Sequence, residues 1–171
     1  MTGLRTTSLV LALITTALSA GLFFVWSYSV MPGLKRSSDR TFVEFLQHTN
    51  KAMLNGWFAL TFGGAVVFML LAGALLLGAD SGIRSAVLPW VIAALVLYIV
   101  QMGITFGVNV PLNDDIDKAG AVDKIADLAA VREHFEAKWV RWNNVRSVVS
   151  VASFSSLTWA LLQYGRHTGK S

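Results

Sequence analysis

The sequence contains no cysteine and few charged residues. Without cysteine there can be no disulfides, thiolate metal ligands, iron–sulfur clusters or cysteine nucleophiles. Charged residues make up only 14% of the chain, whereas about a quarter of an ordinary soluble domain is charged. The net charge of +4 is modest and no nucleic-acid-binding motif is present. We therefore expect neither a soluble enzyme nor a nucleic-acid partner.

Four long stretches carry no charged side chain. They cover residues 6–34, 52–79, 85–113 and 147–165. Each is close to or longer than the ~20 residues that a helix needs to cross a bilayer core of about 30 Å. Because this core holds no water, the backbone polar groups of each segment must be paired within the segment, which requires helices rather than open strands. The sequence predicts an all-α, integral membrane four-helix bundle.

The predicted elements use nearly the whole chain, so we expect a single four-span membrane domain over residues 1–171. The predicted spans cover about residues 7–30, 54–78, 85–110 and 145–165. After the first span, apolar and charged residues alternate at helical spacing over about 38–53, which predicts a short interfacial helix. The final helix is long and extends out of the membrane, with an extramembrane part over about 122–144.

Proline and glycine residues indicate where the first and third spans should end. Met31, Pro32 and Gly33 are expected to stop the first helix, and Pro111 the third. The short turn over residues 80–84 makes the second and third spans antiparallel neighbours. The start of the chain is too long and too apolar for a signal peptide, so we expect a retained span.

One face of the third predicted span is polar. It consists of Gln101, Thr105, Asn109 and Asn113, which recur every four residues. Gly103 and Gly107 lie on the opposite face, in a spacing that allows close helix packing. The amides either hold helices together or line a cavity that opens toward Asn113.

An arginine follows a row of apolar and aromatic side chains on the last predicted helix. One arc of this helix contains Leu128, Val131, Phe135, Trp139, Trp142 and Arg146. Arg146 keeps its proton, so when buried it needs a carboxylate, a carbonyl or amide oxygen, an aromatic face or an anionic ligand. Asn143 flanks it. Arg146 belongs either to a site or to a membrane-boundary anchor, and the tryptophans either to a site or to an interfacial belt.

His48 lies opposite the apolar face of the predicted interfacial helix, one turn from Glu44. The other two histidines, His134 and His167, have no ligand spacing to it. A lone histidine of this kind is more typical of a surface residue than of a metal ligand. We therefore expect no metal site and no haem.

Four motifs occur in a fixed order along the chain. They are residues 27–34 (SYSVMPGL), residues 42–47 (FVEFLQ) with Asn50, residues 109–113 (NVPLN) and residues 139–146 (WVRWNNVR). Together they resemble the anthrone oxygenase-like family of small four-span membrane proteins. Because that family is mainly bacterial, the resemblance implies a bacterial inner membrane. Most Lys and Arg residues lie in the two longer connections, which favours a cytoplasmic position for them.

The resemblance implies oxidation of an anthrone-like or other apolar phenolic aromatic with O₂, and no cofactor. Removal of the acidic methylene proton from such a substrate leaves a delocalised carbanion that can itself reduce O₂. The protein then has to supply a base, stabilisation of the anion and a dry pocket.

The candidate site residues fall into three groups. Arg146, Asn143, Asn109 and Asn113 are the candidate catalytic residues, which would hold the developing oxyanion. Trp139, Trp142, Tyr28 and Asn50 are the candidate substrate-binding residues. His48, Asp114 and Asp115 are possible bases, although the family pattern falls on Gln47 and Asn50 rather than on His48.

Two other functions fit the same residues. One is a non-enzymatic membrane protein that binds a lipid or quinone-like ligand, and the other is a structural subunit of a membrane complex. The expected partners are the lipid bilayer, a small apolar aromatic or lipid-like ligand and, for an enzyme, O₂. A ligand that co-purifies without O₂ consumption would favour the binding protein, and a polar face without a pocket would favour the subunit.

Overall fold

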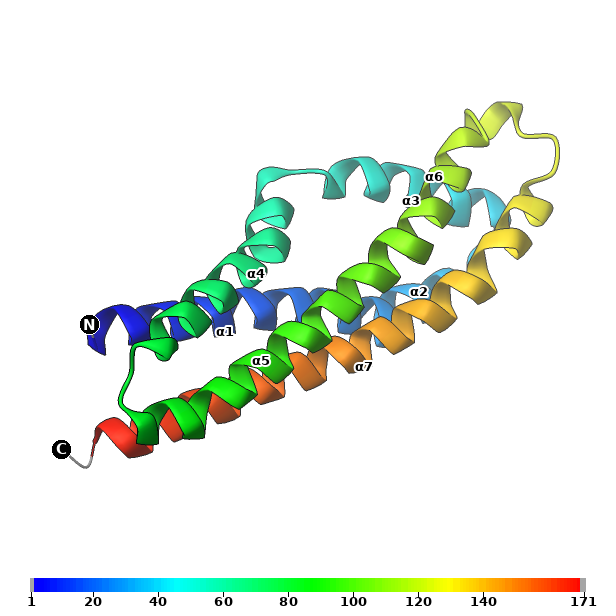
Figure 1. The fold of residues 1–171 in the computed structure, drawn as a ribbon. Coiled ribbons are helices and arrows are strands. Elements are labelled where there is room, and N and C mark those ends of the chain that lie inside the picture. Colours follow the sequence, from blue (N-terminus) through cyan, green and yellow to red (C-terminus); the bar gives the residue numbers. More distant parts are fainter. Residues whose placement is uncertain (1, 170–171) are drawn as a thin grey trace.

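The computed structural model describes residues 2–169 as an almost wholly helical bundle (Figure 1). Four helical stretches are long and apolar enough to cross a bilayer, Thr2–Leu34, Gly56–Leu77, Ser81–Lys118 and Leu128–Thr168. The prediction of an all-α, four-helix membrane bundle is confirmed.

Two of the four stretches consist of several helices joined end to end. The first contains α1 (Thr2–Val25), a π-helical turn (Trp26–Val30) and α2 (Met31–Leu34). The third contains α5 (Ser81–Ile104), a second π-helical turn (Thr105–Asn109) and α6 (Val110–Lys118). The second and fourth are the single helices α4 (Gly56–Leu77) and α7 (Leu128–Thr168). The connections hold α3 (Asp39–Met53) and a 3₁₀ turn (Val122–Lys124).

The expectation that Pro32 and Pro111 stop their helices is wrong. Each proline comes two residues after the end of a π-helical turn, in which the backbone N–H just before the proline donates to the carbonyl five residues earlier. Proline has no N–H and crowds the preceding turn, and the wider π turn takes up this local mismatch. The first and third helices therefore run on through α2 and α6.

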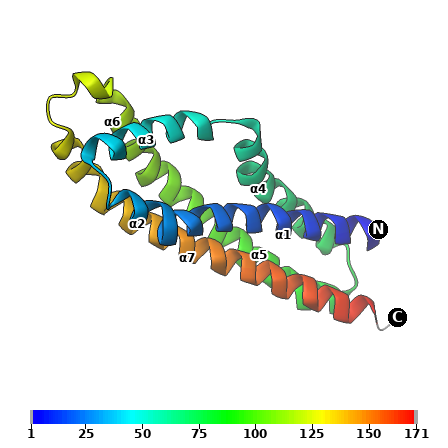
Figure 2. The same cartoon turned by 180° about the vertical axis from the view of Figure 1, so that it is seen from behind.

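The long helices lie side by side, with both ends of the described chain at one end of the bundle (Figures 1 and 2). The helix α5 packs along α7, and α1 packs between α4 and α7. The helices α4 and α5 contact each other less extensively, although a short turn joins them. At the far end, α3 lies across the bundle and meets α4 at a sharp corner.

Alanines are frequent in the core at the end of the bundle that holds both ends of the described chain. This core contains Ala12, Ala65, Ala72, Ala94 and Ala160 together with larger residues such as Leu9, Met69 and Leu76. Small residues let helix backbones approach closely inside a membrane. Buried Arg5 closes this end, because its Nε and one terminal nitrogen donate to the carbonyls of Leu75 and Gly78 at 3.0 and 2.6 Å.

Aromatic side chains fill the other end. Its core includes Trp26, Phe42, Phe135 and Trp139. Two polar residues hold α3 against this core through hydrogen bonds. Arg132 on α7 donates to backbone carbonyls between α2 and α3 and pairs with Asp39, and Gln47 donates to two carbonyls at the end of α6 and just after it. The interfacial-helix prediction matches α3, whose N-terminus is capped by Ser38.

The last helix begins later than its sequence pattern suggests. Residues 122–124 form a separate 3₁₀ turn, and α7 starts at Leu128 after Asp127, whose side chain accepts from the backbone of Ala130. This cap satisfies one of the unpaired N–H groups of the first turn. The helix then continues unbroken to Thr168.

The expected packing role of Gly103 and Gly107 is not met within the described chain. Both glycines are exposed, and a Cβ added at either position would meet no atom within 4 Å. The helix α5 instead turns its polar face toward α7, so the glycine face is the outer one.

Candidate functional site

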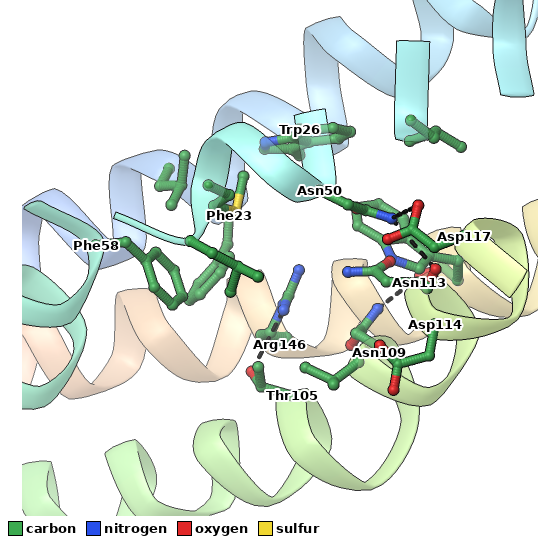
Figure 3. Close-up of a pocket in the computed structure, with 16 residues that line it drawn as sticks. Phe23, Trp26, Asn50, Phe58, Thr105, Asn109, Asn113, Asp114, Asp117 and Arg146 are labelled. Atoms are coloured by element: carbon green, nitrogen blue, oxygen red, sulfur yellow. Dashed lines mark hydrogen bonds between the residues drawn. The ribbon is translucent and has the colours of Figure 1, made fainter. Parts of the chain in front are cut away.

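A pocket of about 790 Å³, including the space at its open mouth, lies at the aromatic end of the bundle (Figure 3). Its walls come from α1 with its π turn, from α3 and the start of α4, from the second π turn with α6, and from α7. The polar lining residues are Asn50, Thr105, Asn109, Asn113, Asp114, Asp117 and Arg146. The polar side chains of the third and fourth helices thus share one hollow.

Arg146 lies at the deep side of this pocket and is only 5% exposed. One terminal nitrogen donates to Asn143 Oδ1 at 2.6 Å and the other to Thr105 Oγ1 at 3.3 Å. Its guanidinium carbon lies 4.0 Å from the centre of the Phe23 ring and 5.6 Å from that of Trp139. Figure 3 shows Arg146 reaching from α7 toward Thr105, between Phe58 on one side and the two asparagines of the opposite helix on the other.

The charge of Arg146 has no ion-pair partner in the described part of the chain. Its Nε also has no hydrogen-bond partner among residues 2–169. Neutral oxygens and aromatic faces compensate only part of the cost of burying a cation, which is several kcal/mol. The pocket is therefore suited to an anionic oxygen that approaches this guanidinium.

Asn109 provides a second unpaired group in the same pocket. Its side chain is 1% exposed, and its Nδ2 donates to the backbone carbonyl of Trp139 in a long bond of 3.4 Å. Its Oδ1 has no partner in the described chain. A buried acceptor without a donor is costly, so a ligand hydroxyl would be favoured here.

Asn113 is used differently, because its Oδ1 accepts a hydrogen bond of 2.8 Å from Trp139 Nε1. This bond fixes the indole, which lies 5.3 Å from the Trp26 ring and stacks on Phe135 at 5.8 Å. Phe58 at the start of α4 completes the aromatic lining. These rings offer flat apolar surfaces to an aromatic ligand.

Carboxylates line the polar end of the pocket. Asp117 is half-buried and Asp114 is exposed. Asn50 on α3 donates to the backbone carbonyl of Asn113 at 3.3 Å and to Asp117 Oδ1 at 3.5 Å. Asn50 thereby joins α3 to α6 at this end.

Five of the predicted site residues do not line the pocket. Asn143 lies behind Arg146, where its Nδ2 donates to Ser27 Oγ and to the carbonyl of Phe23, so it orients the guanidinium. Tyr28 is 61% exposed and rests on Phe24.

The other three lie on outer faces of their helices. Trp142 is half-buried away from the pocket, and His48 is exposed. Asp115 is exposed and lies 4.0 Å from His134, on a separate shallow hollow.

Several lining residues were not among the candidates, and the aromatic or charged ones are Phe23, Trp26, Phe58 and Asp117. Asp117 continues the four-residue spacing of Asn109 and Asn113, so the sequence held a signal for it. The three aromatics come from other helices, and no local pattern shows that tertiary packing brings them to Arg146. Among the described residues, no group of three His, Asp or Glu side chains could hold a metal ion.

Comparison with known proteins gives one family match. No curated protein and no solved structure shows significant similarity to this chain. The sequence model of the anthrone oxygenase family matches residues 52–156. This match covers more than half of the chain and includes α4, α5, α6 and the part of α7 that carries Trp139 and Arg146. The chain belongs to the anthrone oxygenase family.

Proposed function

We propose that this protein is a membrane oxygenase that uses O₂ to convert an anthrone-like or other apolar phenolic aromatic into a quinone. The ring methylene loses both hydrogens and gains one oxygen atom, while the second oxygen atom leaves as water. The substrate gives up four electrons and O₂ takes them up, so the reaction balances without another reductant or oxidant. The family match and the aromatic pocket support this reaction class.

The first step is loss of a methylene proton to a base. The carboxylates of Asp114 and Asp117 are the acceptors that line the pocket, whereas His48 and Asp115 lie outside it. The resulting anion carries much of its charge on the carbonyl oxygen. Arg146 stabilises this oxygen with a permanent charge that no carboxylate of the described chain neutralises.

Electron transfer then needs no group other than the two substrates. The anion passes one electron to O₂, and the superoxide and substrate radical combine and take up a proton to give a hydroperoxide. Loss of water from the hydroperoxide gives the quinone. The protein holds the ring between Trp26, Trp139 and Phe58.

The observation that carries the proposal is the burial of Arg146 in an aromatic pocket without an acidic partner. A purely structural arginine in a membrane would cost less if paired or placed at the surface. The same observation supports an anion-binding protein without catalysis, so the test has to separate the two.

The test is an anthrone oxidation assay on purified protein in vesicles. Quinone formation at 1:1 stoichiometry with O₂ consumption, above the rate in empty vesicles, is the expected result. An absorbance spectrum and metal analysis of the same sample should show no Soret band and no stoichiometric metal. A tightly bound anionic aromatic with no O₂ consumption would instead overturn the oxygenase in favour of the binding protein.

We also propose that the two long connections face the cytoplasm of a bacterial cell. They hold most of the Lys and Arg residues, and the positive-inside rule supports this orientation. A reporter that works only outside the cytoplasm should therefore be active when fused after Thr168, and one that works only in the cytoplasm should be inactive. The opposite result would reverse the orientation.

A further inference from the structure

A groove on the outer surface adjoins the pocket. It lies beside α1 and the corner between α3 and α4, and it includes Leu18, Trp57 and Thr61. The groove and the pocket share Leu22, Met53 and Phe58. These three half-buried apolar side chains form a wall between them that is a single side chain thick.

The wall is built so that it can move. Its side chains are apolar, so their displacement breaks no side-chain hydrogen bond, and Met53 is flexible. Met53 is the last residue of α3, and Phe58 lies in the first turn of α4. The two helices are joined by a short non-helical link over residues 54–55. Leu54 in this link is 84% exposed.

The groove lies at the height of the membrane boundary. Phe58 is in the first turn of α4, and Leu22 is in the last turn of α1 before the π turn. Trp57 on the groove is 77% exposed, as is typical of tryptophans at the boundary between headgroups and acyl chains. A molecule dissolved in the bilayer can therefore reach the groove directly.

The opposite end of the pocket is polar. Asn50, Asp114 and Asp117 lie there, on α3 and α6, which follow the apolar spans. Figure 3 shows Phe58 and Asp117 at opposite sides of the pocket. The pocket thus has an apolar side that faces lipid and a polar end that faces water.

We propose that the aromatic substrate enters the pocket sideways from the bilayer through the wall of Leu22, Met53 and Phe58, while water and protons exchange through the Asp117 end. This inference rests on the proposed function for the identity of the substrate. A fused aromatic ring partitions into lipid, so entry from the bilayer avoids its transfer into water. The water produced in the reaction leaves at the polar end and does not cross the apolar wall.

The absence of native cysteine permits a test that does not depend on activity. Single variants Phe58→Cys, Met53→Cys and Asp117→Cys are spin-labelled and reconstituted in phosphatidylcholine vesicles. Leu60→Cys, an exposed α4 position outside both hollows, is the lipid reference, and Lys51→Cys, an exposed α3 position, is the water reference. The measurement compares collision of each label with O₂ and with a water-soluble nickel chelate.

The wall labels should behave like Leu60→Cys, with O₂ collisions dominant, and Asp117→Cys should behave like Lys51→Cys. Two wall positions are used because either variant alone could disturb the fold. Wall labels that collide mainly with the nickel chelate would overturn the proposal, since the wall would then face water.

The passage itself is tested by narrowing the wall with Met53→Trp. With anthrone supplied in vesicles, kcat/KM should fall about tenfold while kcat changes little, because entry rather than chemistry is slowed. Leu60→Trp, which adds the same bulk outside both hollows, should leave both unchanged. An unaltered kcat/KM in Met53→Trp would overturn lateral entry. If the unmodified protein does not oxidise anthrone at all, the proposed function fails, while the spin-label result still stands.

Discussion

The two ends of the bundle contain the same four long helices but differ in the side chains that fill them. Alanines and aliphatic residues, with the tyrosines Tyr98 and Tyr164, close one end, where the helices pack tightly. Large rings occupy the other end, and a pocket remains between them. Both π-helical turns lie at the pocket end, and each contributes lining residues, Trp26 from the first and Thr105 and Asn109 from the second.

This difference shows how a small membrane bundle can combine a stable core with a hollow. Small residues allow backbones to approach, and their dispersion contacts stabilise the closed end. At the pocket end, the aromatic rings and the two π-helical turns prevent such a close approach of the backbones. Arg146 and Asn109 keep unpaired atoms at the pocket, where a ligand can reach them, whereas Tyr98 and Ser153 in the closed part donate to backbone carbonyls. Two other buried atoms without a partner among the described residues, Thr16 Oγ1 and Gln101 Nε2, lie outside the pocket lining.

The variant with the largest expected effect is Arg146→Ala, which changes the pocket end and leaves the closed end intact. We expect kcat/KM for anthrone oxidation to fall about 10²- to 10³-fold, because the developing oxyanion loses its charged partner. Thermal stability in detergent should change far less than activity, because removing a buried cation without an acidic partner among the described residues offsets the loss of its hydrogen bonds to Asn143 and Thr105.

The matched control is Arg141→Ala, which removes an exposed arginine from the same helix and should leave activity unchanged. A loss of stability in Arg146→Ala without a specific loss of activity would mean that Arg146 holds the helices together, and the distinction between the two ends would disappear.

The converse variant is Met69→Ala in the closed end, where Met69 is fully buried. It should lower the free energy of unfolding by about 2–4 kcal/mol, because a cavity opens in a tightly packed region. Activity of the protein that remains folded should be unchanged, since Met69 does not line the pocket. Unfolding in mixed micelles and specific activity are measured on the same samples. A fall in specific activity would show that the two ends are coupled.

Much of this fold follows from local patterns. The four charge-free stretches and the amphipathic pattern before α4 predict the spans and α3, because burial in lipid imposes strong compositional limits. The effect of Pro32 and Pro111 was not predicted, because a proline does not by itself show whether a helix ends or continues through a π turn; Pro89 lies inside α5 without one. The outward position of Gly103 likewise follows from which face of α5 meets α7.

The candidate site was predictable to the extent that it lies on single helices. Spacing alone places Asn109 and Asn113 on one face, and composition marks Arg146 as costly to bury. The contribution of α1 could not be predicted in the same way, because Phe23 and Trp26 reach Arg146 and Trp139 only through tertiary packing. Asn143 has the composition of a site residue, but its hydrogen bonds to α1 place it behind the pocket.

Asn109→Leu tests the role of the unpaired acceptor in the pocket. It replaces a buried amide, whose oxygen is unpaired and whose nitrogen makes only a long bond of 3.4 Å to the Trp139 carbonyl, by an apolar group of similar size, so stability should change little. The Kd of a hydroxyanthraquinone product should increase about tenfold, because one ligand hydrogen bond is lost. Binding is followed by titration of tryptophan fluorescence. The companion Ser153→Ala, in the closed part, should not change this Kd, and an equal change in both would argue against a ligand role for Asn109.

Gly103→Ala should have the smallest effect, because the outer face of α5 belongs to neither end. A Cβ at this position meets no atom of the described chain within 4 Å, and alanine favours the helix. We expect a change in unfolding free energy of at most about 0.5 kcal/mol and no change in activity. Size-exclusion chromatography and unfolding in mixed micelles measure the result. A shift in oligomeric state, or a loss above about 1 kcal/mol, would show that the paired glycines contact a second chain. The outer face of α5 would then be a third packed region, beside the closed end and the pocket.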